Sequence, residues 1–352
     1  MPEHREQGPS RRRFLQALGT AALAATTVGC GSSCGGAAER RGARPAAPPP
    51  GPAAAAEGRS RVVVVTTKRA LTSGYDADRG ALRAMLAAGL TRLCDAPDAA
   101  AALRRFFRPG ETVGLKVNGL AGRQAATHVE LVDELGALLR RSDVDGAHQL
   151  VFDRAAVDLV TSGFQLSERG DGYRCAGNDA VGYEEEPTVM PSSASRLSRI
   201  ATERIDAMLS VPVLKQHMLS GTSGALKNLF GCIDNPNKMH VDRCDPYIAE
   251  VAALPQLRGK QRLVVVDALR PVIDNGPSYQ PGMGAEAHTL IFGVDPVAVD
   301  TVGRGLLDRL RTARGLPTLA AAKLEPTYIA TAARLGLGVG DEARIDLVTL
   351  EV

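Results

Sequence analysis

Apolar runs rich in β-branched residues recur along the chain and predict the strands of a buried sheet. The runs are continuously apolar rather than alternating, as expected for strands that are covered on both faces. Seven runs are predicted as strands: residues 61–67, 112–118, 148–153, 207–214, 261–269, 288–294 and 344–352. Three segments with apolar residues at three- and four-residue spacing are predicted as helices: 78–94, 128–141 and 296–310.

The alternation of these elements predicts an α/β fold. We expect a mainly parallel central sheet flanked by helices, in three layers. No internal repeat or heptad pattern is visible in the sequence. Residues 61–352 are therefore predicted to form a single large domain, since α/β domains often exceed 250 residues.

The first 34 residues have the pattern of an export leader. The stretch "SRRRFLQ", residues 10–16, places a twin arginine before Phe14 and Leu15, and a weakly apolar segment without acidic residues follows. This pattern predicts a twin-arginine signal peptide, export by the twin-arginine translocase and an extracytoplasmic location, periplasmic or at the cell surface. Residues 35–60 are rich in Pro, Ala and Gly and are predicted to be a tether.

The stretch "TTVGC" leaves two outcomes open for the end of the leader. Cys30 could become a lipidated N-terminus that anchors the protein to a membrane, or the leader could simply be cleaved nearby.

Charge and aromatic content narrow the range of partners. Of the 42 Lys+Arg and 39 Asp+Glu residues, the first 60 positions hold 8 and 4, which leaves a net charge of −1 for the remainder. The predicted domain is therefore not basic, and no nucleic-acid partner is expected. Aromatic residues make up 4% of the chain and Trp is absent, so a platform for stacking bases or sugars is not expected either.

Polar residues follow two of the predicted strands where ligands bind in open α/β sheets, just beyond the carboxyl ends of the strands. "VGLKVN" ends with Lys116 and Asn118, and "VPVLKQH" ends with Lys215 and His217. In both pairs the residues are two apart and share one face of an extended chain. We interpret them as candidate ligand-binding and catalytic groups; the alternative is that the lysines merely emerge at the sheet edge.

The stretch "SGTSGALKNLFG" that follows predicts a short helix. Thr222 or Ser223 is expected to cap it, and Lys227 and Asn228 fall off its apolar face. Its N-terminus, set among glycines and hydroxyl groups, predicts a site for a small anionic ligand.

Two acidic residues lie in "GVDPVAVD", residues 293–300. Asp295 before Pro296 is typical of a helix N-cap, which is the favoured interpretation, with ligand binding as the alternative. Asp300 lies one turn further on, and we expect it to face the same mouth as Lys215 and Lys227.

The segment "MHVDRCD" raises the question of a metal site. If it is extended, His240, Asp242 and Cys244 share a face and could bind zinc or iron; a solvated loop is the favoured alternative. Cys232 and Cys244 are close enough in sequence to form a disulfide after export, or both are buried thiols.

These motifs together resemble the family of proteins known as domain of unknown function 362. The resemblance rests on the following stretches: "VGLKVN" (113–118), "VPVLKQH" (211–217), "TSGALKNLFGCI" (222–233), "KMH" (238–240), "VVVDALRPVIDNGPSYQPG" (264–282) and "GVDPVAVD" (293–300). It adds Asn275 to the candidate residues. It implies export or association with iron–sulfur proteins, but this sequence has no C-x-x-C-x-x-C run and the family brings no settled reaction.

Three functions fit these residues. An enzyme would use Lys215, His217, Lys227 and Asp300 for proton transfer or redox chemistry on an anionic substrate held by Lys116, Asn118, Ser223, Asn228, Asn275 and Asp295. A non-catalytic protein would bind the ligand or assist cofactor maturation in an iron–sulfur or redox system. In the third, the lysines are purely architectural and are neutralised by Asp267, Asp295 and Asp300. The sequence specifies no cofactor.

Overall fold

A computed structural model describes residues 59–72, 74–168 and 172–352. The predicted signal peptide, Cys30 and nearly all of the predicted tether lie outside these residues. The fold described below is that of the predicted domain.

A ten-stranded sheet forms the centre of the described part of the chain. Its main path runs in the order β12 (Ile345–Glu351), β1 (Ser60–Thr66), β11 (Thr289–Gly293), β10 (Gln261–Val272), β7 (Ala207–Val211), β2 (Val113–Val117), β3 (Gln149–Asp153) and β4 (Arg174–Gly177). Two further strands, β8 (Val213–His217) and β9 (Gly221–Ser223), extend from β10.

Most neighbouring strands run parallel. The exceptions are β11, which is antiparallel to both β1 and β10, and β9, which is antiparallel to β8. All seven predicted strands are present in the structure. The predicted strand 207–214 is divided, because Pro212 separates β7 from β8 and its carbonyl accepts a hydrogen bond from Asp267 N at 2.8 Å.

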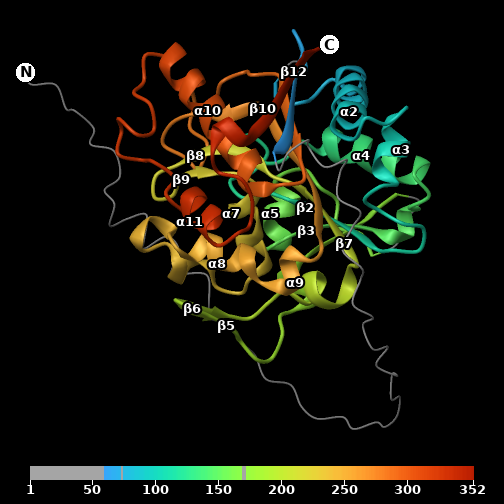
Figure 1. Ribbon diagram of the computed structural model, residues 1–352. Helices are drawn as coiled ribbons and strands as arrows, with labels where there is room; N and C mark the ends of the chain where they lie inside the picture. Colours follow the sequence, from blue (N-terminus) through green and yellow to red (C-terminus); the bar gives the residue numbers. More distant parts are fainter. Residues whose placement is uncertain (1–58, 73, 169–171) are drawn as a thin grey trace, which may run out of the picture. The chain divides into compact units, whose positions relative to one another are not determined.

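Helices cover both faces of the sheet, which confirms the three-layer α/β prediction. Val63 and Val65 of β1 belong to the apolar core beneath α2 (Arg79–Cys94), α3 (Ala99–Leu103) and α4 (Val129–Arg141), while Val62 and Val64 belong to the core beneath α10 (Pro296–Ala313). Figure 1 shows α2, α3 and α4 together on one side of the sheet and α10 on the other.

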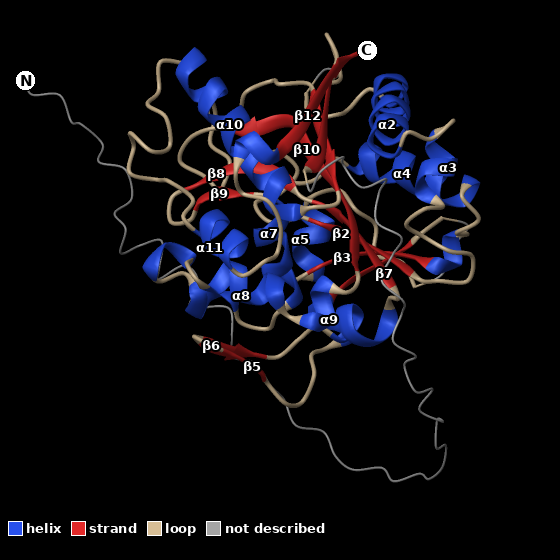
Figure 2. Cartoon of the chain, viewed as in Figure 1, coloured by secondary structure: helices blue, strands red, loops and turns tan. Residues whose placement is uncertain are grey.

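The remaining helices are short, and Figure 2 shows most of them on the side that carries α10. They are α5 (Ala156–Thr161), α6 (Asn178–Val181), α7 (Ala225–Asn228), α8 (Tyr247–Ala253), α9 (Pro255–Arg258) and α11 (Tyr328–Arg334). Single 3₁₀ or π turns occupy Gly146–His148, Ile200–Arg204, Leu229–Cys232, Pro236–Met239, Asp242–Cys244 and Glu342–Arg344, and β5 (Thr188–Met190) pairs with β6 (Ser193–Ser195). Among the described helices, none has both the length and the apolar character that a membrane span requires.

Candidate functional site

Lys215 and His217 lie at the end of β8, on the hairpin that β8 forms with β9. Lys215 is opposite Ser223 and His217 is opposite Gly221 in this pair. Gly221 allows the tight return because its φ is +81° and because a Cβ there would lie 2.0 Å from the carbonyl oxygen of Leu324. Both basic side chains are buried, with only 1% of Lys215 and 3% of His217 exposed.

The amine of Lys215 has no acidic partner. It donates to Asn118 Oδ1 at 2.7 Å and to the carbonyl oxygen of Leu120 at 3.0 Å. No carboxylate of the described chain lies within ion-pairing distance of it. Burial lowers the pKa of Lys215 to about 7, against the smaller opposing effect of Asp153.

His217 is held as a neutral ring. Its Nδ1 accepts hydrogen bonds from the backbone N–H groups of Leu219 at 3.1 Å and Ser220 at 3.3 Å, so the proton of the neutral ring is on Nε2. The ring stacks on that of His240, with 5.6 Å between the ring centroids. Burial lowers the pKa of His217 far below its ordinary range, and the nearby Lys227 lowers it further.

Lys227 provides a second amine without an acidic partner. Its Nζ lies 3.3 Å from His240 Nε2 and 5.0 Å from the centroid of the Phe230 ring. Since His240 Nδ1 lies 2.9 Å from the carbonyl oxygen of Pro236, that nitrogen carries the proton, and Nε2 accepts from Lys227. Burial lowers the pKa of Lys227 to about 8 and that of His240 to about 4.

These four residues form one group, which we call the basic cluster: Lys215, His217, Lys227 and His240. They lie close enough that Lys215, Lys227 and His240 each lower the pKa of His217. Within the described residues, no Asp or Glu side chain is bonded to any of them. The basic cluster therefore has no directly bonded carboxylate that would neutralise a charged amine.

Lys116 and Asn228 have partners within the protein instead. Lys116 Nζ lies 2.7 Å from Asp153 Oδ1 and donates to Asn228 Oδ1 at 3.2 Å. Asn228 Nδ2 donates in turn to the carbonyl oxygen of Lys116 and to Ser210 Oγ, both at 3.0 Å. This buried network joins α7 to β2, and its hydrogen bonds leave little capacity for a ligand.

Asp300 occupies the place where an external anion was expected. Its two carboxylate oxygens accept from the N–H groups of Ala225 at 2.6 Å and Leu226 at 3.1 Å, at the start of α7. Asp300 therefore caps α7, whereas the sequence predicted Thr222 or Ser223. Gly224 is required there, because a Cβ would lie 2.3 Å from Asp300 Oδ1. Burial raises the pKa of Asp300 to about 7.

Asp300 was expected to face the same ligand-binding opening as Lys215 and Lys227, and this expectation is wrong. Its carboxylate instead accepts from two backbone N–H groups and lies 3.3 Å from the hydroxyl of Tyr328. That hydroxyl also lies 2.7 Å from Thr222 Oγ1.

The hydrogen bonds of Asp295 and Asn275 are made with residues outside the basic cluster. Asp295 is the N-cap of α10, as the favoured interpretation held, and it also accepts from Val339 N at 2.8 Å. The exposed side chain of Asn275 donates to Asp274 at 3.1 Å.

The predicted metal triplet does not form. His240 follows the 3₁₀ turn Pro236–Met239, and Asp242 and Cys244 lie in another, so the segment is not extended as the alternation required. Asp242 is exposed while Cys244 is buried. Throughout the described ranges, no group of three or more His, Cys, Asp or Glu side chains could hold a metal ion. Cys232 and Cys244 are separate buried thiols, so the disulfide alternative is not realised.

A family model matches residues 113–304, and its description is "Domain of unknown function (DUF362)". The chain belongs to this family. All four residues of the basic cluster lie within the matched part of this DUF362 protein. No curated protein sequence matches the chain.

Solved structures similar to this DUF362 protein include the following two. One is a crystal structure of a Thermotoga maritima protein, with a TM-score of 0.41, 11% identity, and coverage of 68% of this chain and 61% of that one. The other is lactate racemase apoprotein from Thermoanaerobacterium thermosaccharolyticum, with a TM-score of 0.36, 11% identity, and coverage of 72% and 58%. The chain thus spans about three fifths of the length of each.

One acidic partner was missed by the sequence analysis, and another was assigned to the wrong basic groups. Asp153 ends β3 and pairs with Lys116, and its position at the end of an apolar run was the available signal. Asp267 accepts from both the backbone N–H (2.8 Å) and the ring Nδ1 (2.7 Å) of His128, a residue that has no partner apparent in the sequence. Because His128 engages Asp267, that carboxylate is not bonded to Lys215 or Lys227.

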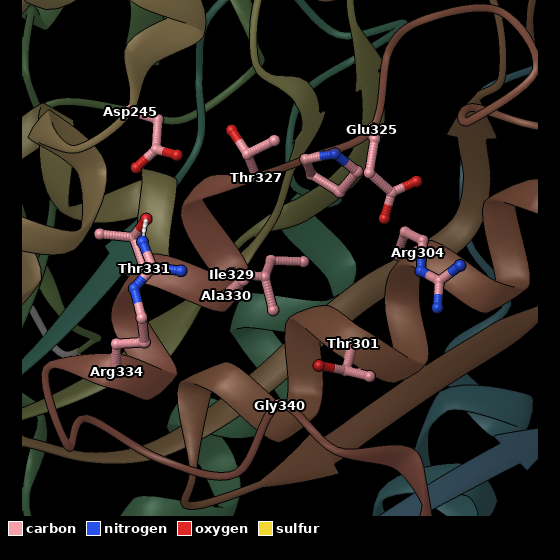
Figure 3. Close-up of a pocket in the computed structure, with 11 residues that line it drawn as sticks. Asp245, Thr301, Arg304, Glu325, Thr327, Ile329, Ala330, Thr331, Arg334 and Gly340 are labelled. Atoms are coloured by element: carbon pink, nitrogen blue, oxygen red, sulfur yellow. Dashed lines mark hydrogen bonds between the residues drawn. The ribbon is translucent and has the colours of Figure 1, made fainter.

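A cavity of about 350 Å³ in this DUF362 protein is lined mainly by α10, α11 and the segment before α11, with Asp245 and Gly340 added from other segments (Figure 3). Its wall carries Arg304 and Arg334 as well as Asp245 and Glu325, so opposite charges are mixed around it. Arg304 is already paired with Asp308 and Glu342. No residue of the basic cluster lines this cavity, and the candidate site remains at the basic cluster, where the charge is not balanced.

Proposed function

We propose that the basic cluster binds a small anionic ligand and exchanges protons with it. The observation that supports this is a pair of amines, Lys215 and Lys227, without a carboxylate partner in the described part of the chain. Structural lysines in protein interiors are normally paired. Strongly lowered pKa values at such groups are typical of functional sites.

The side chains of the basic cluster have different roles in this proposal, and each role follows from the charge of the side chain. Lys227, with a pKa of about 8, is largely charged near neutral pH and attracts the anion. Lys215, with a pKa of about 7, can accept a proton from the ligand or return it, because both of its forms are populated near neutrality. His217 remains neutral and can donate from Nε2.

The test is ligand retention. Protein purified under native conditions is analysed by mass spectrometry and elemental analysis, and binding of glyoxylate, glycolate and inorganic phosphate is measured by calorimetry. We expect Lys215→Ala and Lys227→Ala to abolish binding and to leave the melting temperature nearly unchanged. Lys238→Ala is the matched control, because Lys238 is an exposed lysine of the neighbouring turn. If both test variants unfold instead, the two lysines are structural and the proposal fails.

A non-catalytic role in ligand capture or cofactor maturation is the second candidate. Three exposed apolar side chains favour it, because they adjoin the cluster and would suit delivery to a partner: Leu120, Met218 and Leu219. A bound ligand that is recovered chemically unchanged after prolonged incubation supports this role. A ligand that is consumed supports catalysis.

We further propose that the protein is exported by the twin-arginine pathway, on the strength of "SRRRFLQ" at residues 10–16. Changing Arg11, Arg12 and Arg13 to Lys should retain the protein in the cytoplasm. Unchanged fractionation would refute this proposal, and radiolabelled fatty acid incorporation would show whether Cys30 is lipidated.

A further inference from the structure

The hydrogen bonds of the buried and half-buried lysines differ in number. Lys260 Nζ donates to three carbonyl oxygens, those of Ala201, Thr202 and Ile205, all at 2.8 Å. Lys116 Nζ also has three acceptors: the carbonyl oxygen of Val117, Asp153 Oδ1 and Asn228 Oδ1. Three acceptors match the three N–H donors of an ammonium group.

Lys215 has two acceptors, Asn118 Oδ1 and the carbonyl oxygen of Leu120. Two acceptors match a neutral amine, which has two N–H donors and a lone pair. An ammonium group in this place would leave one donor without a partner among the described residues, which is unfavourable in a buried position. The lone pair of the neutral amine is free of hydrogen bonds.

We propose that Lys215 is a nucleophile that forms an imine with a 2-oxo acid, a ligand with a carbonyl group next to a carboxylate. The proposal rests on the proposed function, since Lys227 supplies the charge that holds the carboxylate. A buried amine beside a second cationic group is a recognised arrangement for this chemistry.

Other groups of the site fit the reaction. The Nε2–H of His217 is available to the carbonyl oxygen of the ligand, because Nδ1 is occupied by the N–H groups of Leu219 and Ser220. Ser223 is paired with Lys215 across the β8–β9 hairpin, so the two residues lie opposite each other on the same face of the hairpin.

The amine lies close beneath the surface. Leu120, whose carbonyl oxygen accepts from Lys215, is 44% exposed, and Met218 and Leu219, which follow His217, are 49% and 40% exposed. A shift of these chain segments would open the amine to a small ligand, and their apolar side chains would then exclude water from the imine.

The step balances without an oxidant or a reductant. The lone pair of Lys215 Nζ forms the new C–N bond while the carbonyl π bond opens onto oxygen. The oxygen then leaves as water with one hydrogen that the amine gives up and one proton that solvent supplies, directly or through His217. A protonated imine retains one N–H for Asn118 Oδ1.

The experiment is reductive trapping. The full-length protein is incubated with glyoxylate or pyruvate and sodium cyanoborohydride, which reduces the imine to a stable secondary amine, and the adduct is located by peptide mass spectrometry. We expect one adduct for each chain, on Lys215, and loss of that adduct in Lys215→Arg while Lys238→Ala still forms it. Mapping in the wild-type protein keeps the test valid even if Lys215→Arg does not fold.

The two proposals fail in different ways. If glyoxylate and its hydroxy counterpart glycolate both bind but no adduct forms, or the adduct lies on another lysine, the imine proposal is overturned and anion binding stands. If none of glyoxylate, pyruvate, glycolate or phosphate binds, the proposed function is overturned, and the imine proposal with it.

Discussion

The amine of Lys215 on β8 donates to the side-chain oxygen of Asn118, which follows β2, at 2.7 Å. An amide oxygen attracts the amine without supplying the full negative charge that would favour an ammonium group. Asn118 thus stabilises the position of Lys215 without stabilising its charge, and this contact is the first to test.

Asn118→Asp should raise the pKa of Lys215, so that its amine is protonated near neutral pH. A carboxylate at hydrogen-bonding distance raises the pKa of an amine by roughly 1–3 units. The rate of reductive methylation of Lys215, followed by peptide mass spectrometry against pH, should have a midpoint near the pKa of about 7 in the wild type and a clearly higher one in the variant. An unchanged midpoint would show that Asn118 does not set the charge of Lys215; Asn118→Ser is the neutral control.

Lys215 should also influence how stability changes with pH. Its pKa is about 7 in the folded protein against an ordinary value of 10.5, so the unfolded chain binds more protons between these values. The free energy of unfolding contributed by this residue therefore rises with pH across that window, by at most about 1.4 kcal/mol per pH unit. Asp153, Asp267, Asp158 and Lys227 are the charged groups that act on it.

The measurement is urea unfolding at several pH values between 7 and 10. The wild-type protein should gain stability with pH relative to Lys215→Met, which cannot titrate at this position. Parallel curves for the two proteins would mean that Lys215 has an ordinary pKa when folded.

Substitution of Lys116 should cost much more stability than substitution of Lys215, although the two lysines lie in similar motifs of β2 and β8. Lys116→Met leaves the carboxylate of Asp153 buried without its ion-pair partner, and removal of one partner from such a pair costs about 3–5 kcal/mol. Lys215→Met breaks no ion pair and should cost much less at pH 7. Urea unfolding compares the two, and adding Asp153→Asn to Lys116→Met should recover part of the loss.

Asp300→Asn should lower stability without affecting the basic cluster. An amide has one acceptor oxygen, so one of the N–H groups of Ala225 and Leu226 loses its partner, at a cost of about 1–3 kcal/mol. Calorimetry below the melting temperature should give unchanged anion affinity, and Tyr328→Phe should cause a smaller loss of stability. If the variant instead binds the anion more weakly while its stability is unchanged, Asp300 is part of the binding site.

The sequence predicted the main strands and helices well because these elements depend on short-range signals. Continuous apolar runs marked the seven predicted strands, and Asp295 with Pro296 marked the start of α10. Lys215 and His217 were identified because polar residues directly follow an apolar run. The division of the predicted strand 207–214 into β7 and β8 also has a local cause, which is Pro212.

The partners of the polar groups could not be predicted in this way. Lys116 pairs with Asp153 and His128 with Asp267, and the N–H groups of Ala225 and Leu226 bind Asp300, from a different helix. These choices depend on strand order and on helix placement across the sheet, which local patterns do not encode.

By itself, then, the sequence determined which segments are strands and helices, that the sheet is buried on both faces, and that unusual basic groups gather at the ends of strands. Only the tertiary structure decided which of these groups are neutralised. Burial makes an unpaired charge unfavourable, so Lys116 is stabilised by the carboxylate that β3 brings beside it. The amine of Lys215 donates only to an amide oxygen and a carbonyl oxygen, and its pKa is instead lowered to about 7.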